Sequence, residues 1–301
     1  MNPSLRERIL GSLLGGALGD AWGTLYEGQK GPVQFVVPDR PFVSDDTQLT
    51  FATCESIINL GAVDPAHLAA HFLRWFTAGR VRGIGASTLK AFRDLQVGTH
   101  WALAGAKGEF AAGNGAAMRI APLAFLLDPD VREDRAIIRD VCHITHRNDE
   151  AYVGALAVIL AIRAVLSGEW SERRSFLQAV IEKLPDSAVR DRMEQLLPLQ
   201  ISASEVAVRF GASGYVVDTV PLALYCAQNI VAQPFESILA LAISCGGDTD
   251  TTASIAGQVA GTVVGVTSIN PELVQRIEDS EEITAIANQF ADFACGASQR
   301  F

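Results

Sequence analysis

Two short clusters of carboxylate and hydroxyl side chains interrupt an otherwise apolar sequence. One is Ser44-Asp45-Asp46-Thr47, and the other is Asp248-Thr249-Asp250-Thr251-Thr252, which follows Gly246-Gly247. Each cluster opens an apolar helical segment, so helix capping explains one oxygen in each. Capping does not require several neighbouring carboxylates, which repel one another unless a cation binds between them. Carboxylate and hydroxyl oxygens suit Mg²⁺ or Mn²⁺ rather than Zn²⁺, so these residues predict a divalent-metal site.

Helices are the elements that must position both clusters, because helical periodicity dominates the sequence. Asp64-Pro65 marks a clear helix start, Val220-Pro221 marks a less clear one, and Gly61, Gly79 and Gly168 mark helix ends. The expected helices lie near residues 3–19, 46–61, 65–78, 86–96, 131–145, 149–167, 173–184, 187–198, 218–231, 235–244, 249–266 and 272–297.

Other kinds of structure are scarce in the sequence. Strand-like runs are short, at Val33–Val37 and Tyr215–Val217, and no low-complexity linker divides the chain. We therefore expect one compact all-α domain over residues 1–301. The irregular loops of this domain, which are long enough to build a site, are expected near residues 20–45, 97–117 and 199–217.

Glycines recur every four residues in two of the expected helices. The stripes are Gly11, Gly15 and Gly19 near the start, and Gly257, Gly261 and Gly265 near the end. Glycine inside a helix costs about 1 kcal/mol relative to alanine, so two regular stripes indicate that something favours them. We expect these two helices to be central and to pack closely, with backbones touching where side chains are missing.

Composition excludes several classes of protein. Hydrophobic residues make up 49% of the chain, which is too much for intrinsic disorder. The 34 Asp and Glu outnumber the 24 Lys and Arg, giving a net charge of −10. Nucleic acid and anionic membranes are therefore not expected as partners. The uncharged run from Thr251 to Pro271 is long enough to span a bilayer, but its many polar side chains favour a buried central helix.

The cysteines and the absence of a heptad bear on cell compartment and assembly. The five cysteines are widely spaced without a CxxC motif, which indicates free thiols in a reducing cytoplasm. No sustained heptad or apolar surface stripe stands out, so we expect a monomer.

Seven motifs occur in order along nearly the whole chain. They are Gly15–Glu27, Ser44–Thr47, Arg82–Thr88, Gly113–Arg119, Thr145-His146, Phe210–Tyr215 and Gly246–Thr251. Each motif is weak alone, and the order makes the match specific. Together they resemble the ADP-ribosylglycohydrolase family, of the type that includes dinitrogenase-reductase-activating glycohydrolases.

The resemblance implies an all-α fold with a two-metal site at helix termini, binding two Mg²⁺ or Mn²⁺ ions. The family pattern places the metal ligands at the two clusters, with serine at 44 where threonine is more usual. Serine keeps the ligand oxygen, so we expect the metal to be retained. The implied ligands are Ser44, Asp45, Asp46, Asp248, Asp250 and Thr251.

The resemblance also implies hydrolysis at the anomeric carbon of a ribose. A carboxylate then serves as general acid or base, and the candidates are Asp46, paired with Asp45 at the metal, and Glu27. Glu27 matches an acidic loop residue that gates the site in some relatives, although an exposed loop carboxylate is an equal alternative. Asp20 is expected to end the first helix and to contact a metal ligand, or to be a simple turn carboxylate.

The remaining candidates would bind the substrate. In the family, Gly113-Asn114-Gly115 holds the diphosphate of ADP-ribose ahead of an apolar helix, whereas by itself this sequence is more often a tight turn. His146 follows the family's Thr-His pattern near the ligand, and its alternative is a helix cap or surface residue. Tyr215 could stack on the adenine or on a ribose, or be an ordinary buried tyrosine.

The implied activity is removal of ADP-ribose from an ADP-ribosylated protein, with ADP-ribosyl-arginine as the first choice of linkage. A non-catalytic ADP-ribose binder, or an immunity protein that occludes a toxin, is the alternative of a different class. A two-metal phosphohydrolase is a third possibility, which release of AMP instead of ADP-ribose would identify.

Overall fold

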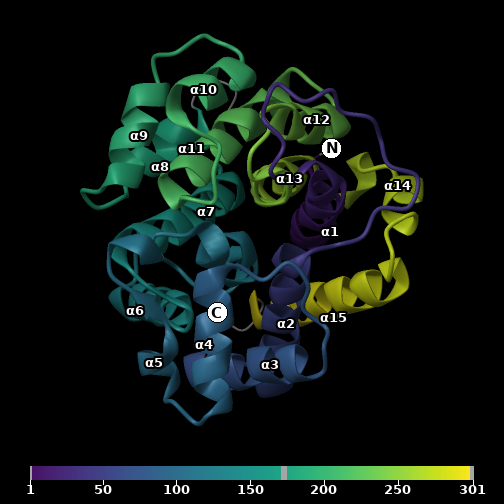
Figure 1. Ribbon diagram of the computed structural model, residues 1–301. Coiled ribbons are helices and arrows are strands. Elements are labelled where there is room, and N and C mark those ends of the chain that lie inside the picture. The colour runs from purple at the N-terminus through teal and green to yellow at the C-terminus, as the bar shows by residue number, and fades with distance from the viewer. Residues whose placement is uncertain (1, 171–174, 299–301) are drawn as a thin grey trace.

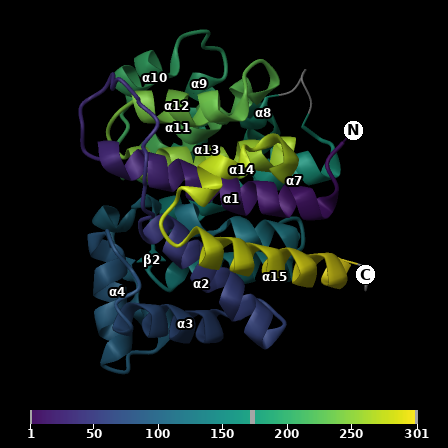
Figure 2. The same ribbon diagram turned by 90° about the vertical axis from the view of Figure 1, so that its right-hand side faces the viewer.

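Two glycine-rich helices form the centre of the fold in the computed structural model, which describes residues 2–170 and 175–298 (Figure 1). They are α1, Leu5–Gly23, and α13, Thr249–Val264. They run antiparallel and lie side by side in both views (Figure 2). A Cβ atom on Gly11 would lie 2.2 Å from the carbonyl oxygen of Gly261, and one on Gly19 would lie 2.2 Å from that of Ala253. The two backbones are therefore in contact, which confirms the prediction from the glycine stripes.

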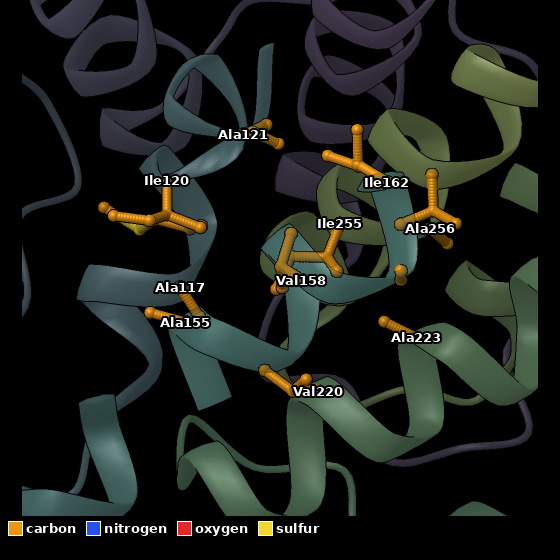
Figure 3. Close-up of a cluster of buried hydrophobic side chains, with 14 of the residues drawn as sticks. Ala117, Ile120, Ala121, Ala155, Val158, Ile162, Val220, Ala223, Ile255 and Ala256 are labelled. Atoms are coloured by element: carbon orange, nitrogen blue, oxygen red, sulfur yellow. The ribbon is translucent and has the colours of Figure 1, made fainter. Parts of the chain in front are cut away.

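A core of small and branched side chains packs around this pair. Figure 3 shows Ala155, Val158 and Ile162 of α7, Asp149–Ser167, facing residues from α11, Val216–Ala227, and from α13. Helix α7 is long and apolar enough to cross a membrane, but 72% of its apolar window is buried inside the protein. It therefore serves as a core helix here. The prediction for the uncharged run from Thr251 to Pro271 is confirmed over α13, which is buried from Thr249 to Thr262, but the rest of the run lies beyond the end of α13 at Val264.

Other helices cover this core, with α3 and α4 on one side of the central pair and α9 to α12 on the other (Figures 1 and 2). The helices not yet named are α2 Asp45–Leu60, α3 Pro65–Thr77, α4 Ala86–Gln96, α5 Trp101–Ala104, α6 Arg132–His143, α8 Phe176–Ile181, α9 Ala188–Leu196, α10 Ala203–Phe210, α12 Phe235–Ser244, α14 Pro271–Gln275 and α15 Ser280–Ser298. The 3₁₀ helices are η1 Thr24–Tyr26, η2 Glu109–Ala111, η3 Asn114–Arg119, η4 Ala121–Phe125, η5 Gln228–Val231 and η6 Val266–Ser268.

The strands of the described chain are two short ones that the sequence did not indicate. Strands β1, Ala106–Lys107, and β2, His146–Arg147, pair in parallel with Ala106 opposite His146. Neither expected strand forms, since Val33–Val37 is irregular and Tyr215–Val217 leads into α11. The pairing matters for the site because it fixes the backbone of His146.

Several predicted boundaries are wrong for identifiable reasons. The expected loop 199–217 contains α10, which begins with a capping box between Ser202 and Glu205. Pro221 lies inside α11 instead of starting a helix. The expected helix 272–297 divides into α14 and α15 near Asp279, whose φ is 63°.

Some of the expected ranges reach past the described residues. Residues 173 and 174 of the expected helix 173–184 lie outside them, as do the ends of the expected domain, residue 1 and residues 299–301.

Candidate active site at two helix N-termini

The N-terminus of α2 is held by a carboxylate from α1. Asp20 is fully buried, and its Oδ2 atom accepts hydrogen bonds from the backbone N–H groups of Ser44 and Thr47, each at 3.0 Å. The Ser44 hydroxyl donates to Asp20 at 2.7 Å. Asp20 does not end α1 as expected, because α1 continues to Gly23. It lies in the last turn and contacts the predicted ligand Ser44, so the alternative of a simple turn carboxylate is wrong.

The N-terminus of α13 is fixed by glycine backbone contacts. Gly246 and Gly247 have φ angles of 72° and 77°, in the left-handed region that favours glycine. A Cβ on Gly247 would lie 1.9 Å from the carbonyl oxygen of Ala212. The loop after α1 pairs with this turn, because Gly28 N–H donates to Gly247 O and Gly247 N–H donates to Gln29 O. The glycine pair therefore brings Glu27 to the start of α13.

The two acidic helix starts meet at Asp46. Thr251 donates a hydrogen bond from its hydroxyl to Asp46 Oδ2 at 3.2 Å, so α13 touches α2 at this point. Asp46 is 1% exposed, and its other carboxylate oxygen, Oδ1, is buried without a hydrogen-bond partner. An unpartnered buried carboxylate oxygen is costly, which makes it a candidate ligand for a cation.

The buried carboxylates raise one another's pKa values. Burial raises the pKa of Asp46 well above its usual range, and the charge of Asp250 raises it further. Burial together with the charges of Asp20 and Asp248 raises the pKa of Asp45 to about 7. Burial and the contact with Asp248 raise the pKa of Asp250 to about 10. Without a counter-charge, this cluster therefore favours bound protons over negative charge.

The donor chemistry fits hard divalent cations. Carboxylates, the Thr251 hydroxyl and the orphaned oxygen of Asp46 are the kinds of atoms that Mg²⁺ and Mn²⁺ bind. A cation would also relieve the repulsion that raises the pKa values. In the described part of the chain, no three His, Cys, Asp or Glu side chains converge as a closed ligand set. Hydroxyl groups contribute to the arrangement here, since those of Ser44 and Thr251 both lie against Asp46.

A cleft of about 240 Å³ opens onto these carboxylates. Among its lining residues are Glu27, Asp45, Asp46, Thr88, Gly113, Asn114, Gly115, His146, Asp248, Asp250 and Thr251. Glu27 is exposed at the edge of the cleft, and its pKa is raised by burial and by the charges of Asp248 and Asp20. The structure thus brings together all the predicted site residues except Ser44 and Asp20, which lie behind Asp46, and Tyr215.

Tyr215 lies next to the cleft without lining it. Its backbone pairs with Gly113, and its side chain is 43% exposed, so it is not an ordinary buried tyrosine. The neighbouring Gly214 accepts a hydrogen bond from Asn114 N–H and lines the cleft itself. The apolar helix expected after Gly115 is instead the 3₁₀ helix η3, followed by η4.

His146 is held as a neutral side chain. Its ring is 3% exposed and packs against Gly113 and Gly115, where added Cβ atoms would lie 3.2 Å and 2.8 Å from ring atoms. Its Nδ1 atom is 2.8 Å from the Thr145 hydroxyl. Burial, with the charge of Arg119 adding to it, lowers the pKa of His146 to about 3. His146 is therefore neither a surface residue nor a cap.

Arg119 is a site residue that sequence reasoning left without a role. It is 1% exposed, donates to the Thr145 hydroxyl at 2.9 Å and donates to the carbonyl oxygen of Gly115. The Thr145 hydroxyl therefore accepts from Arg119 and can donate to Nδ1 of His146, which leaves the proton of the ring on Nε2. The signal for Arg119 was its place in the Gly113–Arg119 motif, but the sequence does not show that an arginine there is buried.

Comparison with known proteins identifies the family of the chain. The family model described as ADP-ribosylglycohydrolase matches residues 1–299. The ADP-ribosylarginine hydrolase Tri1 of Pseudomonas putida is 29% identical, over 96% of this chain and 79% of its own length. Human ADP-ribosylhydrolase ARH3 is 27% identical, over 93% of this chain and 92% of its own length.

A solved structure shares the fold. The structure of an ADP-ribosylglycohydrolase-related protein complex aligns with a TM-score of 0.68 and 26% identity, covering 96% of this chain and 99% of that one. The family match spans nearly the whole chain, and the acidic cleft lies where the family motifs meet. The chain therefore belongs to the ADP-ribosylglycohydrolase family and is a glycohydrolase.

Proposed function

We propose that this protein uses two Mg²⁺ or Mn²⁺ ions to remove ADP-ribose from modified arginine side chains of proteins. The observation that supports this most directly is the meeting of two acidic helix starts at Asp46, whose buried Oδ1 has no partner. The name of the Pseudomonas putida relative supports arginine as the acceptor.

The proposed ions would be held by the two clusters that line and back the cleft. When bound, they supply positive charge that orients the ribose hydroxyls and favours an ionised water. The protein's part is to keep the ligand oxygens in place. Asp20 does so by binding both backbone N–H groups at the start of α2, and the packed backbones of α1 and α13 fix the start of α13. The proposed ligands are Ser44, Asp45, Asp46, Asp248, Asp250 and Thr251.

Proton transfer is assigned to Glu27, and a water-orienting, charge-stabilising role is assigned to Asp46. Hydrolysis breaks the bond between the anomeric carbon and the guanidino nitrogen, and water supplies a hydroxyl to the carbon and a proton to the nitrogen. Glu27 lies at the solvent edge of the cleft, where it can exchange protons with water and with a leaving group. Asp46 is too buried to reach the acceptor, so its role is to orient the water and offset the positive charge of the transition state.

The acidic lining favours a cationic acceptor. Among the described residues lining the cleft there is no lysine or arginine, while Glu27 contributes a carboxylate that the proposed ions do not use. A guanidinium leaving group is stabilised by this field, whereas a serine hydroxyl gains little from it. The diphosphate then depends on neutral donors, for which we propose the backbone N–H groups of Gly113 and Gly115 and the Nε2–H of His146, with Tyr215 stacking at the edge.

Release of ADP-ribose from an arginine-ADP-ribosylated protein tests this function. We expect release with Mg²⁺ or Mn²⁺, and none after chelation or with Asp46→Ala. Activity on a serine-linked substrate alone would replace arginine as the acceptor. Metal-dependent ADP-ribose binding without release from any linkage would instead support the non-catalytic alternative.

A control variant should separate loss of chemistry from loss of fold. Asp292→Ala removes an exposed carboxylate of α15 that pairs with Arg6, far from the cleft-lining residues. We expect it to retain the activity of the unsubstituted protein. Equal loss in Asp292→Ala and Asp46→Ala would show that the assay reports folding instead of catalysis.

A further inference from the structure

Asn114 has no hydrogen-bond donor left for a substrate. Its backbone N–H donates to Gly214 O at 3.1 Å. The two hydrogens of its side-chain amide are also engaged, one to Thr219 Oγ1 at 3.0 Å and one to Asp248 Oδ2 at 2.8 Å. An asparagine residue carries these three donors and no more. The side chain can therefore offer only its carbonyl oxygen to the cleft, which phosphate oxygens cannot use.

Thr219 determines which end of the amide faces Asp248. The hydroxyl of Thr219 donates to the carbonyl oxygen of Ser213 at 2.7 Å, so toward Asn114 it can only accept. The amide must therefore present its NH₂ group to Thr219, and the same NH₂ group reaches Asp248. Asn114 donates to Thr219, and Thr219 in turn donates to Ser213. These two hydrogen bonds anchor the amide to α11, while its other hydrogen reaches Asp248.

The side chain of Asp248 does not make the capping hydrogen bond that its place before α13 favours. It is the residue preceding α13, where an aspartate usually accepts a hydrogen bond from the first turn of its own helix. The Asp248 side chain makes no such bond. Its Oδ2 instead meets Asn114, and Gly214 makes room, because a Cβ there would lie 3.0 Å from this oxygen.

We infer that Asn114 is a positioning residue for Asp248, directing one carboxylate oxygen toward η3 and leaving the other to bind a divalent cation. Thr219 acts through Asn114 by fixing the orientation of the amide. This inference rests on the proposed metal-dependent function, and it gives Asn114 a different role from the diphosphate contact that the sequence suggested. Partners that orient a metal ligand typically change metal affinity by about 10–100-fold when removed.

The test measures two affinities of the 301-residue chain. Titration calorimetry measures the affinity for Mn²⁺, and a second titration measures the affinity of the metal-free protein for ADP. For Asn114→Ala we expect Mn²⁺ affinity to fall by about 10–100-fold, with ADP affinity unchanged. Unchanged Mn²⁺ affinity together with weakened ADP binding would overturn the inference and make Asn114 a phosphate ligand. If the unsubstituted protein binds no Mn²⁺, the metal site itself is wrong, and the inference falls with it.

A second pair of variants separates positioning from folding. Thr219→Val removes the acceptor that orients the amide and should lower Mn²⁺ affinity less than Asn114→Ala, while Thr219→Ser should restore it. A purely structural role for Thr219 predicts equal thermal destabilisation in both variants without this recovery. The matched control is Asn229→Ala, since the amide of Asn229 also donates twice, to Tyr225 O and Cys226 O, away from the cleft. We expect its Mn²⁺ affinity to equal that of the unsubstituted protein, and an equal loss in Asn229→Ala would count against the inference.

Discussion

The body of α13 and its first turn face very different neighbours. Along the body, Gly257 and Gly261 touch carbonyl oxygens of α1, and neither helix brings a charge into this contact. At the first turn, Asp250 lies buried among other carboxylates, and burial and repulsion raise its pKa to about 10. The body of α13 stabilises the fold by close packing, whereas the buried charges of its first turn oppose folding. The packing of the body of α13 against α1 therefore keeps the acidic residues of the first turn together.

The largest expected effect is a loss of activity, without loss of fold, when the acidic region is changed. Asp46→Ala removes the carboxylate at which the two helix starts meet, so we expect ADP-ribose release to fall on the order of 10²–10³-fold. The variant should stay folded, because it also removes a buried carboxylate that costs stability. The measurements are initial rates of release and the thermal unfolding temperature. An inactive but unfolded variant would mean that Asp46 supports the fold as much as the site.

The next largest expected effect is a loss of stability when the glycine contact between α1 and α13 is changed. A Cβ on Gly19 would lie 2.2 Å from a carbonyl oxygen of Ala253, and two helix backbones must separate to admit it. We expect Gly19→Ala to destabilise the protein by about 3 kcal/mol or more, measured by denaturant unfolding. Gly296 in α15 is the matched control, because an added Cβ meets nothing within 4 Å. Gly296→Ala should stabilise by about 0.5–1 kcal/mol, and similar losses in both variants would contradict the close-contact explanation.

These two regions also differ in how far the sequence determines them. The four-residue glycine spacing predicts the α1–α13 contact because a periodic pattern reports which face of a helix touches its neighbour. The clusters at 44–47 and 248–252 predict which oxygens gather, because their composition exceeds what capping requires. The partner of each oxygen is not encoded locally. Asn114 and Asp248 are far apart in the chain, and only the folded positions of η3 and the start of α13 bring them together.

Other features escaped prediction for related reasons. Helix α10 was missed because its segment is short, and only the Ser202–Glu205 capping box signals it. Arg119 was left without a role because a charged side chain is usually exposed, whereas this one is buried against Thr145. Burial of a charged group is a consequence of the assembled fold, so periodicity and composition do not show it.

A smaller effect should come from adding metal. The proposed site would bind divalent cations in the folded protein and not in the unfolded chain, so Mn²⁺ at about 100 times its dissociation constant should add about 2.7 kcal/mol of stability. Protons compete for the same oxygens, since the pKa of Asp45 is raised to about 7 and that of Asp250 to about 10. At one fixed Mn²⁺ concentration, the gain in stability should therefore be larger at pH 8 than at pH 6. Thermal unfolding with and without Mn²⁺ at both values measures it, and an equal gain at both would contradict a carboxylate site.

The smallest effect concerns the metal-free protein and has the opposite sign from most core substitutions. The folded-state pKa of Asp250 is raised to about 10, above its unfolded value of about 3.9. Between these values the folded state binds a proton that the unfolded state does not, so stability falls as the pH rises and levels off above about 10. Asp250→Asn lacks this slope. We expect the variant to be more stable than the metal-free parent at pH 8, by on the order of 1 kcal/mol.

This difference should shrink as the pH falls and should be small at pH 4, close to the unfolded-state pKa of Asp250, below which the group is protonated in both states. Denaturant unfolding in the presence of chelator at pH 8, 6 and 4 measures it. Asp292→Asn, on the exposed face of α15, is the control and should show no comparable gain. If Asp250→Asn proved less stable than its parent at pH 8, the carboxylate of Asp250 would be supporting the fold. The first turn of α13 would then no longer differ from its glycine-packed body in the way that the structure indicates.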